Sequence, residues 1–272
     1  MRLIPLICAA CLTALPAAGF DLTSTINGMH AVKLDQLNPN PSGLADECSG
    51  RAITDYATQG GQMVYDAGWV VQSELVVNGL SVVSYASALR PMAGAPCAVD
   101  DGHLAIFRGR SLLGFYLTDP TMIYPDGSPL EQVGALEQVG PDVVRVSAGG
   151  PYLTPFADLH IDATGARLTE IATLTTVCGD RQVPNIYGQP ILNARAALAE
   201  AGWHPVAQTP APHADPFFAT HNITEVSDCA GTGMGYCGFT YDDSSGNRLT
   251  VTTGGDRPEY APVLSTRADC AN

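Results

Sequence analysis

Short runs rich in Val, Ile, Leu, Tyr and Thr recur between positions 69 and 173, and turn-forming residues separate them. This pattern is typical of antiparallel strands joined by tight turns. Asn78-Gly79, between two of the runs, is the strongest two-residue signal for a β-hairpin. Many strands and little helix predict an antiparallel sandwich or an open barrel. The strands are expected at 69–77, 80–86, 103–107, 112–117, 143–147, 157–162 and 167–173.

A different period begins near position 190. Pro190 suits the first position of a helix, and Gly202 suits the left-handed residue that follows its end. Between them, apolar residues recur at helical steps on one face: Ile191, Ala194, Leu198 and Ala201. Strand patterns follow at 203–207, 239–241 and 248–252, with a turn at 242–247. The sequence therefore predicts an α+β, β-rich protein whose small C-terminal domain packs one helix on an antiparallel sheet.

The segment VPNIYGQPILNARAALAEAGWHPV, residues 183–206, resembles the opening of a PASTA domain, a small extracytoplasmic module. The resemblance consists of a Val-Pro strand, a Gly before the helix and an Ala-Gly exit into the next strand. RLTVTTGG, residues 248–255, is similar to the closing strand of that domain. The resemblance implies an extracytoplasmic module and suggests peptidoglycan as a ligand. The matching residues are structural, so no binding residue is carried over.

Three segments have weaker patterns. Residues 20–46 are polar and interrupted by Asn-Pro-Asn-Pro-Ser-Gly, so we expect at most one short element there. Residues 48–63 suit a short helix or a loop. Residues 130–139, LEQVGALEQV, also suit a loop or a short helix.

The first residues have the features of a secretory signal peptide. Arg2 precedes an apolar run, and Ala17-Ala18-Gly19 supplies the small residues of a cleavage site. The run is shorter than the roughly 20 apolar residues that a membrane span needs. The composition changes again near Val177. We therefore predict a signal peptide over 1–19, a β-rich domain over 20–177 and an α+β domain over 178–272, with no membrane span in the mature chain.

The mature chain keeps an even number of cysteines: Cys48, Cys97, Cys178, Cys229, Cys237 and Cys270. An even number in an exported chain indicates disulfides and a periplasmic or secreted location. The sequence alone does not choose among the possible pairings. The preferred set keeps each bond within one predicted domain and ties the ends of the second domain together: Cys48 with Cys97, Cys178 with Cys270, and Cys229 with Cys237.

Composition narrows the classes of function. The chain is 46% hydrophobic and 15% charged, as in folded proteins, and its formal net charge is −14. A surface this acidic repels nucleic acid and anionic membranes and favours cationic partners. Lys33 is the sole lysine, which excludes a P-loop and leaves little scope for lysine chemistry. No cofactor is indicated.

Two groups of polar residues are candidate sites. Asp100, Asp101 and His103 follow Cys97, and they could form an acid/base pair or a calcium site, although ordinary turn chemistry around Gly102 explains them as well. The second group contains metal-ligand residue types without a fixed spacing, and a solvated loop is the simpler interpretation. Its members are His213, Asp215, His221, Glu225 and Asp228. We therefore predict no metal site and assign no catalytic residue.

Two further pairs have both functional and ordinary interpretations. His160 and Asp162 point to the same face of a predicted strand, as a catalytic pair or a solvated face would. Arg108 and Arg110 flank a hairpin tip, where they could bind a carboxylate or phosphate or simply be exposed. Residues 242–247 lack the spacing of a calcium loop and are predicted to be a hairpin turn.

The sequence favours an exported, disulfide-containing, non-enzymatic module that binds a protein or cell-wall ligand. The expected partners are a cationic exported protein or peptidoglycan, and one concrete form is an acidic inhibitor of a basic exported enzyme such as a lysozyme. The alternative is a secreted hydrolase whose carboxylates are brought together by the fold. A structural component of an envelope or appendage is a third hypothesis.

Overall fold

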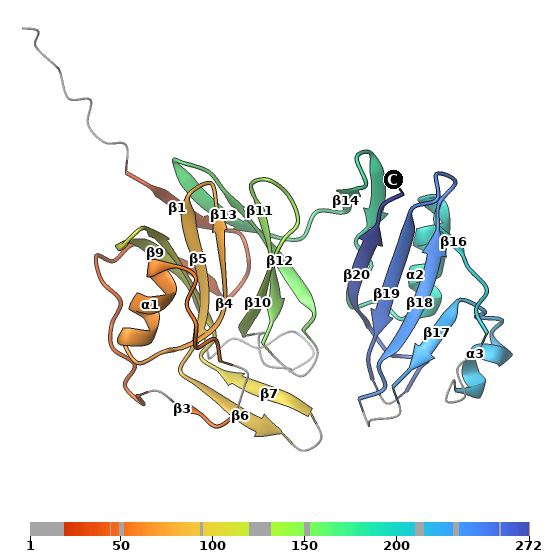
Figure 1. Cartoon of the computed structure of the whole chain (residues 1–272), viewed down its shortest axis with the longest axis horizontal. Coiled ribbons are helices and arrows are strands. Elements are labelled where there is room, and N and C mark those ends of the chain that lie inside the picture. Colours follow the sequence, from red (N-terminus) through yellow and green to blue (C-terminus); the bar gives the residue numbers. More distant parts are fainter. Residues whose placement is uncertain are drawn as a thin grey trace, which may run out of the picture.

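A computed structural model describes most of the chain (Figure 1). The described residues are 19–43, 45–48, 52–92, 95–119, 132–149, 153–209, 215–230, 234–255 and 257–271. The predicted signal peptide, apart from Gly19, and the candidate ligand His213 lie outside these residues. Strands and short helices make up the described part, which confirms the β-rich α+β class.

Two five-stranded sheets form the N-terminal half. The first, here the β12 sheet, has the order β1-β13-β12-β11-β10, and β1 runs parallel to β13. Its strands are β1 (Asp21–Ser24), β10 (Val133–Gln138), β11 (Val143–Ala148), β12 (Pro155–Ile161) and β13 (Gly165–Thr169). The second, the β8 sheet, has the order β2-β9-β8-β5-β4 and is antiparallel. Its strands are β2 (Met29–Val32), β4 (Val70–Val77), β5 (Leu80–Ala86), β8 (His103–Arg108) and β9 (Ser111–Thr118).

One hydrophobic core lies between these two sheets. Leu104 and Ile106 of β8 and Leu159 and Ile161 of β12 are members of it, and all are almost completely buried. Because these residues alternate along their strands, each strand turns its other side chains to the opposite face. The N-terminal half is therefore a sandwich, and in the described residues neither sheet closes into a barrel.

A short helix covers the other face of the β8 sheet. Helix α1 (Gln59–Asp66) begins after Thr58, whose hydroxyl accepts a hydrogen bond of 2.9 Å from the N–H of Gly61. Val64 of the helix packs with Tyr85 and Phe107 of the sheet. With both faces covered, every residue of β5 is buried. A small third sheet, β3 (Ala45–Asp46), β6 (Ala88–Met92) and β7 (Ala95–Asp100), extends this half.

The C-terminal half contains the predicted helix on an antiparallel sheet. Helix α2 (Ile191–Glu200) packs with the β18 sheet around Leu198, Trp203 and Phe239. The strands of this sheet are β16 (His204–Pro205), β17 (Val226–Cys229), β18 (Cys237–Asp242), β19 (Arg248–Thr253) and β20 (Val263–Asp269). A hairpin of β14 (Leu174–Val177) and β15 (Arg181–Pro184) precedes the helix, and a second short helix, α3 (Pro216–Thr220), follows it.

Helix α2 ends as the sequence predicts. Gly202 has φ +84°, and its N–H donates to the carbonyl of Ala199 at 3.1 Å. The N–H of Trp203 donates to the carbonyl of Leu198 at 2.9 Å. Together these bonds form a Schellman motif, which needs a residue that tolerates positive φ. At the other end, Pro190 is the N-cap rather than the first helical residue, because its ψ of 148° is extended.

Two predictions about the weaker segments are wrong. Residues 130–139 contain strand β10 rather than a loop or helix, and residues 20–46 contain three short strands rather than at most one element. In β10, Gly134 weakens the apolar pattern, yet it is required because a Cβ there would lie 2.4 Å from the Cα of Gly149. In β1, Leu22 is the buried apolar residue, and the strand exists because it pairs with distant β13.

Three disulfides join the preferred pairs: Cys48 with Cys97, Cys178 with Cys270, and Cys229 with Cys237. The first lies beside the small third sheet, and the third links paired residues of β17 and β18. The two large hydrophobic cores share no residue, and the predicted boundary near Val177 lies between Leu168 of one and Val183 of the other. The division into two domains remains a prediction.

Candidate functional site

The candidate group after Cys97 does not form a catalytic site. Asp100 lies in an ion pair with Arg90, with 2.5 Å between Oδ2 and Nε. Asp101 has φ +48° in the turn before β8 and accepts a hydrogen bond of 3.1 Å from the Ser87 hydroxyl. Burial lowers the pKa of His103, so its ring is held in the neutral form. Each member of the group thus has a structural partner or environment of its own.

Three described members of the second candidate group have structural roles, and the fourth, Asp228, is exposed on β17. Asp215 caps α3 by accepting a hydrogen bond of 2.8 Å from the N–H of Phe217. The ring of His221 lies 4.1 Å from that of Phe217. Glu225 is fully buried and is 2.5 Å from the Nε atom of Arg195. No group of three or more His, Cys, Asp or Glu side chains in the described residues could hold a metal ion.

The two hairpin predictions have clear outcomes. The guanidinium of Arg108 donates to the carbonyl of Ala163 at 3.0 Å, whereas Arg110 is exposed. Residues 242–247 form the turn between β18 and β19. Asp243 organises this turn because its Oδ1 atom accepts hydrogen bonds from the N–H groups of Ser245, at 2.8 Å, and Asn247, at 2.9 Å.

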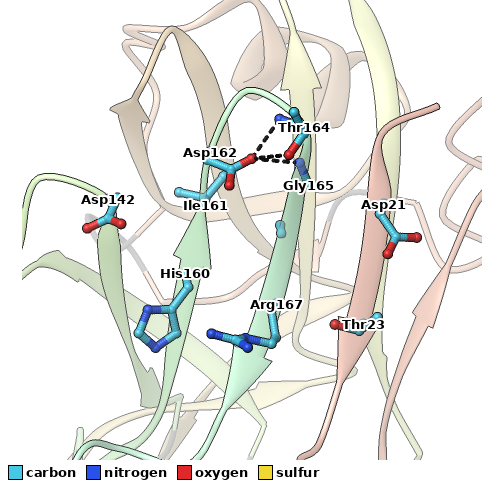
Figure 2. Close-up of a pocket in the computed structure, with 10 residues that line it drawn as sticks. Asp21, Thr23, Asp142, His160, Ile161, Asp162, Thr164, Gly165 and Arg167 are labelled. Carbon is cyan, nitrogen blue, oxygen red and sulfur yellow. Dashed lines mark hydrogen bonds between the residues drawn. The ribbon is translucent and has the colours of Figure 1, made fainter. Parts of the chain in front are cut away.

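A polar hollow lies on the outer face of the β12 sheet, the face turned away from the sandwich core. Its cavity volume is about 440 Å³. Leu159 and Ile161 of β12 point into the core, so His160 and Asp162 point outward by the alternation of the strand. Figure 2 shows the side chains that line the hollow, which come from β1, β12, β13 and the residue before β11. This hollow is the candidate site.

The strand register aligns three polar side chains across the hollow. Thr23 pairs with Arg167, and Arg167 pairs with His160. Residues directly opposite on neighbouring strands point to the same face and lie about 5 Å apart. Thr23, Arg167 and His160 therefore form one row, and Figure 2 shows the guanidinium of Arg167 extending toward the imidazole of His160.

Three exposed carboxylates stand at the end of the hollow nearer the β12–β13 turn: Asp21, Asp142 and Asp162. Asp162 accepts hydrogen bonds from the Thr164 hydroxyl at 2.7 Å, the Thr164 N–H at 2.6 Å and the Gly165 N–H at 3.0 Å. These bonds lower its pKa, the hydroxyl contributing most, and hold the carboxylate ionised in a fixed orientation. Asp21 is 3.4 Å from the ammonium of Lys33.

Most of the described arginines form ion pairs, whereas Arg167 and His160 have no such partner within the described residues. The described arginines that form ion pairs are Arg90, Arg145, Arg181, Arg195, Arg248, Arg257 and Arg267. Arg167 has no hydrogen-bond or ion-pair partner among the described residues, although acidic residues outnumber basic ones 27 to 13 in the chain. The side chain of His160 likewise has none within this part of the chain. Both can therefore donate to a ligand in the hollow.

Sequence reasoning found only part of this site. His160 and Asp162 stood out because they alternate with apolar residues on one strand. Arg167 was missed because its position opposite His160 depends on the register of the β12–β13 hairpin. Asp142 and Asp21 were missed because β11 and β1 bring them to the hollow by pairing with β12 and β13. The detectable signal was Arg167 itself, a polar residue between buried Ala166 and Leu168 on the next predicted strand.

A second polar cluster lies on the same face of the β12 sheet and joins it to the C-terminal half. Arg145 and Asp158 are 4% and 2% exposed and form a bidentate pair, with Nε–Oδ1 and Nη2–Oδ2 distances of 2.9 and 3.1 Å. Arg145 also donates to the hydroxyls of Tyr187, at 3.2 Å, and Thr175, at 3.1 Å. The hydroxyl of Tyr187 in turn lies 2.9 Å from that of Thr266. These groups hydrogen-bond to one another, so the cluster has a structural role: it connects the β12 sheet to the C-terminal half.

Comparisons with protein-family models, with curated proteins and with solved structures found no match. The resemblance of residues 183–206 to a PASTA domain therefore stays a prediction. In the described residues, no helix has the length and apolar character that crossing a membrane requires. The fold and the disulfides define the class of protein: it is β-rich and cross-linked by three disulfides. The disulfides are consistent with an oxidising extracellular or periplasmic location.

Proposed function

We propose that this protein is an exported binding module and that the hollow on the β12 sheet holds its ligand. The observation that carries the proposal is that Arg167 and the neighbouring His160 have no side-chain partner among the described residues, in a hollow whose rim bears carboxylates. Unpaired hydrogen-bond donors of this kind in a concave site are available to fix a ligand. Strand pairing fixes the backbone positions of the two residues relative to each other, and a bound ligand would order the exposed side chain of Arg167.

The proposed ligand is a component of the cell wall, peptidoglycan, or a cationic exported protein. The carboxylates of Asp21, Asp142 and Asp162 attract cationic groups, and the net charge of −14 extends that attraction over the surface. In the second form, the protein would act as an acidic inhibitor of a basic exported enzyme. Both forms use the same face of the β12 sheet.

A secreted hydrolase is the second candidate because Asp142 and Asp162 line one hollow. A glycosidase needs one carboxyl group that stays protonated to act as the general acid. Asp162 cannot supply it, because the hydrogen bonds from Thr164 and Gly165 lower its pKa. Asp142 and Asp162 are both exposed, so neither lies in the kind of apolar pocket in which a general acid usually stands. Binding without chemistry is the better supported function.

Co-sedimentation tests the proposal. The disulfide-bonded protein would be incubated at low salt with purified cell-wall sacculi, and in parallel with immobilised lysozyme as a basic exported enzyme. Arg167→Gln should lose binding to the sacculi and Asp142→Asn should weaken capture by lysozyme, whereas Arg110→Gln should retain both. Arg110 is the matched control because it is exposed at the tip of the neighbouring β8–β9 hairpin and does not line the hollow.

The outcomes separate the candidates. Binding to sacculi that Arg167→Gln abolishes supports the cell-wall form, and capture by lysozyme that Asp142→Asn weakens supports the inhibitor form. Release of soluble fragments from the sacculi would favour the hydrolase. If the protein binds neither material, or if neither Arg167→Gln nor Asp142→Asn changes binding, the proposed function is wrong.

A further inference from the structure

The charges within the hollow are separated rather than mixed. His160, Arg167 and Thr23 lie at one end, and the carboxylates of Asp142 and Asp162 lie at the other end, nearer the β12–β13 turn (Figure 2). A ligand of a single charge would be attracted by one end and repelled by the other. The arrangement therefore suits a ligand that carries both charges.

The first end is suited to a carboxylate. A guanidinium presents its donors as a planar fork that matches the two oxygens of a carboxylate. Arg167 has no partner among the described residues, and its pairing with His160 and Thr23 places an imidazole and a hydroxyl on either side of it. The guanidinium extends toward His160 and away from Thr23 (Figure 2), so Arg167 and His160 are the two donors that a carboxylate would meet together.

The second end is suited to an ammonium group. Asp21 already forms an ion pair with Lys33, with 3.4 Å between Oδ1 and Nζ. Asp142 remains without a side-chain partner in the part of the chain described. Asp162 is fixed by its three hydrogen bonds from Thr164 and Gly165, which use a single oxygen, Oδ1. Asp142 and the Oδ2 atom of Asp162 are therefore available to accept hydrogen bonds from a cation.

We infer that the hollow binds the zwitterionic end of an α-amino acid, with its carboxylate on Arg167 and His160 and its ammonium on Asp142 and Asp162. Asp162 directly follows β12 and is two residues from His160, or about 7 Å along an extended chain. An ammonium and a carboxylate on one carbon, each with a hydrogen bond of about 2.9 Å, span on the order of 8 Å. This inference rests on the proposed function and specifies the chemistry of its ligand.

Three matched probes test the inference: alanine, N-acetylalanine and alaninamide, each as both enantiomers. N-acetylalanine lacks the ammonium and is larger by an acetyl group, and alaninamide lacks the carboxylate and has nearly the size of alanine. Binding would be followed by NMR chemical-shift titration of the labelled, disulfide-bonded protein. Alanine should shift resonances of the hollow, and each blocked probe should bind about tenfold more weakly, because one charge-assisted contact is lost.

Two variants assign the ends of the ligand. Asp142→Asn should weaken the binding of alanine and leave that of N-acetylalanine unchanged, whereas Arg167→Gln should weaken both. Arg110→Gln should bind all three probes as the parent does, which controls for net charge. Equal affinity for the three probes, or no shift with alanine, would overturn the inference.

The failures of the two proposals are distinguishable. Binding to sacculi that depends on Arg167, or to lysozyme that depends on Asp142, with no response to alanine, would retain the binding module and discard the amino-acid ligand. A selective response to alanine with no binding to either macromolecule would retain the ligand chemistry and discard the proposed partners. The titration with free alanine thus tests whether the hollow binds a soluble α-amino acid. Co-sedimentation with sacculi tests whether it binds the same zwitterionic end when it is attached to the wall.

Discussion

His103 lies with its ring centroid 6.0 Å from that of Trp69 and 5.6 Å from that of Tyr85. Its Nδ1 atom accepts a hydrogen bond of 3.3 Å from the N–H of Thr118, which requires that this nitrogen carry no proton. Burial lowers the pKa of the ring below the ordinary value of 6.5, and the nearby charge of Asp101 opposes the shift only in part. At the residue scale, a side chain that the sequence places among acid/base candidates is part of the packing.

The stability of the protein should depend on His103 below neutral pH. The unfolded chain binds a proton near the ordinary pKa of 6.5, whereas the folded chain binds it only at lower pH. The contribution is therefore complete above that value and is lost as the pH falls toward the folded pKa, at up to about 1.4 kcal/mol per pH unit. Urea unfolding between about pH 7 and pH 5 would measure it.

His103→Gln should flatten this part of the pH profile. His204→Gln is the control because His204 is exposed on β16, and it should leave the profile unchanged. An equal slope in the parent and in His103→Gln would show that the buried imidazole is not the source.

At the element scale, local signals predicted local structure. Asn78 and Gly79 adopt φ values of 52° and 74°, and the flanking strands pair Val77 with Leu80. These positive angles are what a two-residue hairpin needs, so the sequence of the turn was sufficient to predict it. The helix α2 was predicted for the same reason, because its period and its terminal Gly202 are contained in one segment.

Elements that depend on distant partners could not be predicted. Strand β10 has a weak pattern of its own and is held by long-range contacts, such as the hydrogen bond from the Ser84 hydroxyl to the carbonyl of Gly134. The candidate site follows the same rule. His160 and Asp162 were predicted to share a face because they alternate with apolar residues, whereas Arg167 joins them through the pairing of β12 with β13. The register of this hairpin depends on the geometry of the turn at 162–165, which the residue pattern alone did not define.

The turn gives a test at this scale. Gly79→Ala should lower the free energy of unfolding by about 1 kcal/mol, because a Cβ disfavours positive φ. The space around Gly79 is open, with nothing within 4 Å of an added Cβ, so a clash would not confuse the result. Gly140→Ala is the matched control. Gly140 lacks a positive φ, and its nearest contact would be an ordinary 3.5 Å, so the substitution should be neutral or slightly stabilising.

Urea unfolding of the two variants would settle the comparison. If Gly79→Ala were as stable as Gly140→Ala, the backbone requirement at the turn would have been overestimated.

At the scale of the whole molecule, two large hydrophobic cores are joined across the cluster around Arg145. Its guanidinium binds Asp158 within the β12 sheet and reaches Tyr187 and Thr175 in the C-terminal half. Taking one charge of a buried pair away leaves the other without a partner, at a cost of several kcal/mol. The outer face of the β12 sheet thus has two roles: one end joins the halves and the other end forms the hollow.

The disulfides should contribute unequally to stability. Cys178–Cys270 closes a sequence separation of 92 residues, whereas Cys229–Cys237 closes one of 8. In the chain-entropy model a longer loop restricts the unfolded chain more, and the two bonds are worth about 4.6 and about 2.6 kcal/mol. Replacing Cys178 and Cys270 by Ala should therefore destabilise the protein by about 2 kcal/mol more than replacing Cys229 and Cys237.

Unfolding of the two double variants in urea would measure the difference. Equal losses, or a larger loss on removing Cys229–Cys237, would contradict the entropic account.

The long disulfide also determines how the chain bears tension. A pull on the C-terminus passes through Cys270 directly to Cys178, because the bond connects them. The residues between these cysteines carry no load and add no length while the bond is intact. Reduction would release them, about 92 residues or on the order of 30 nm of extended chain. In an oxidising compartment the intact bond thus prevents a pulling force from extending the residues between Cys178 and Cys270. Once a reductant breaks the bond, the same force can unfold and extend them.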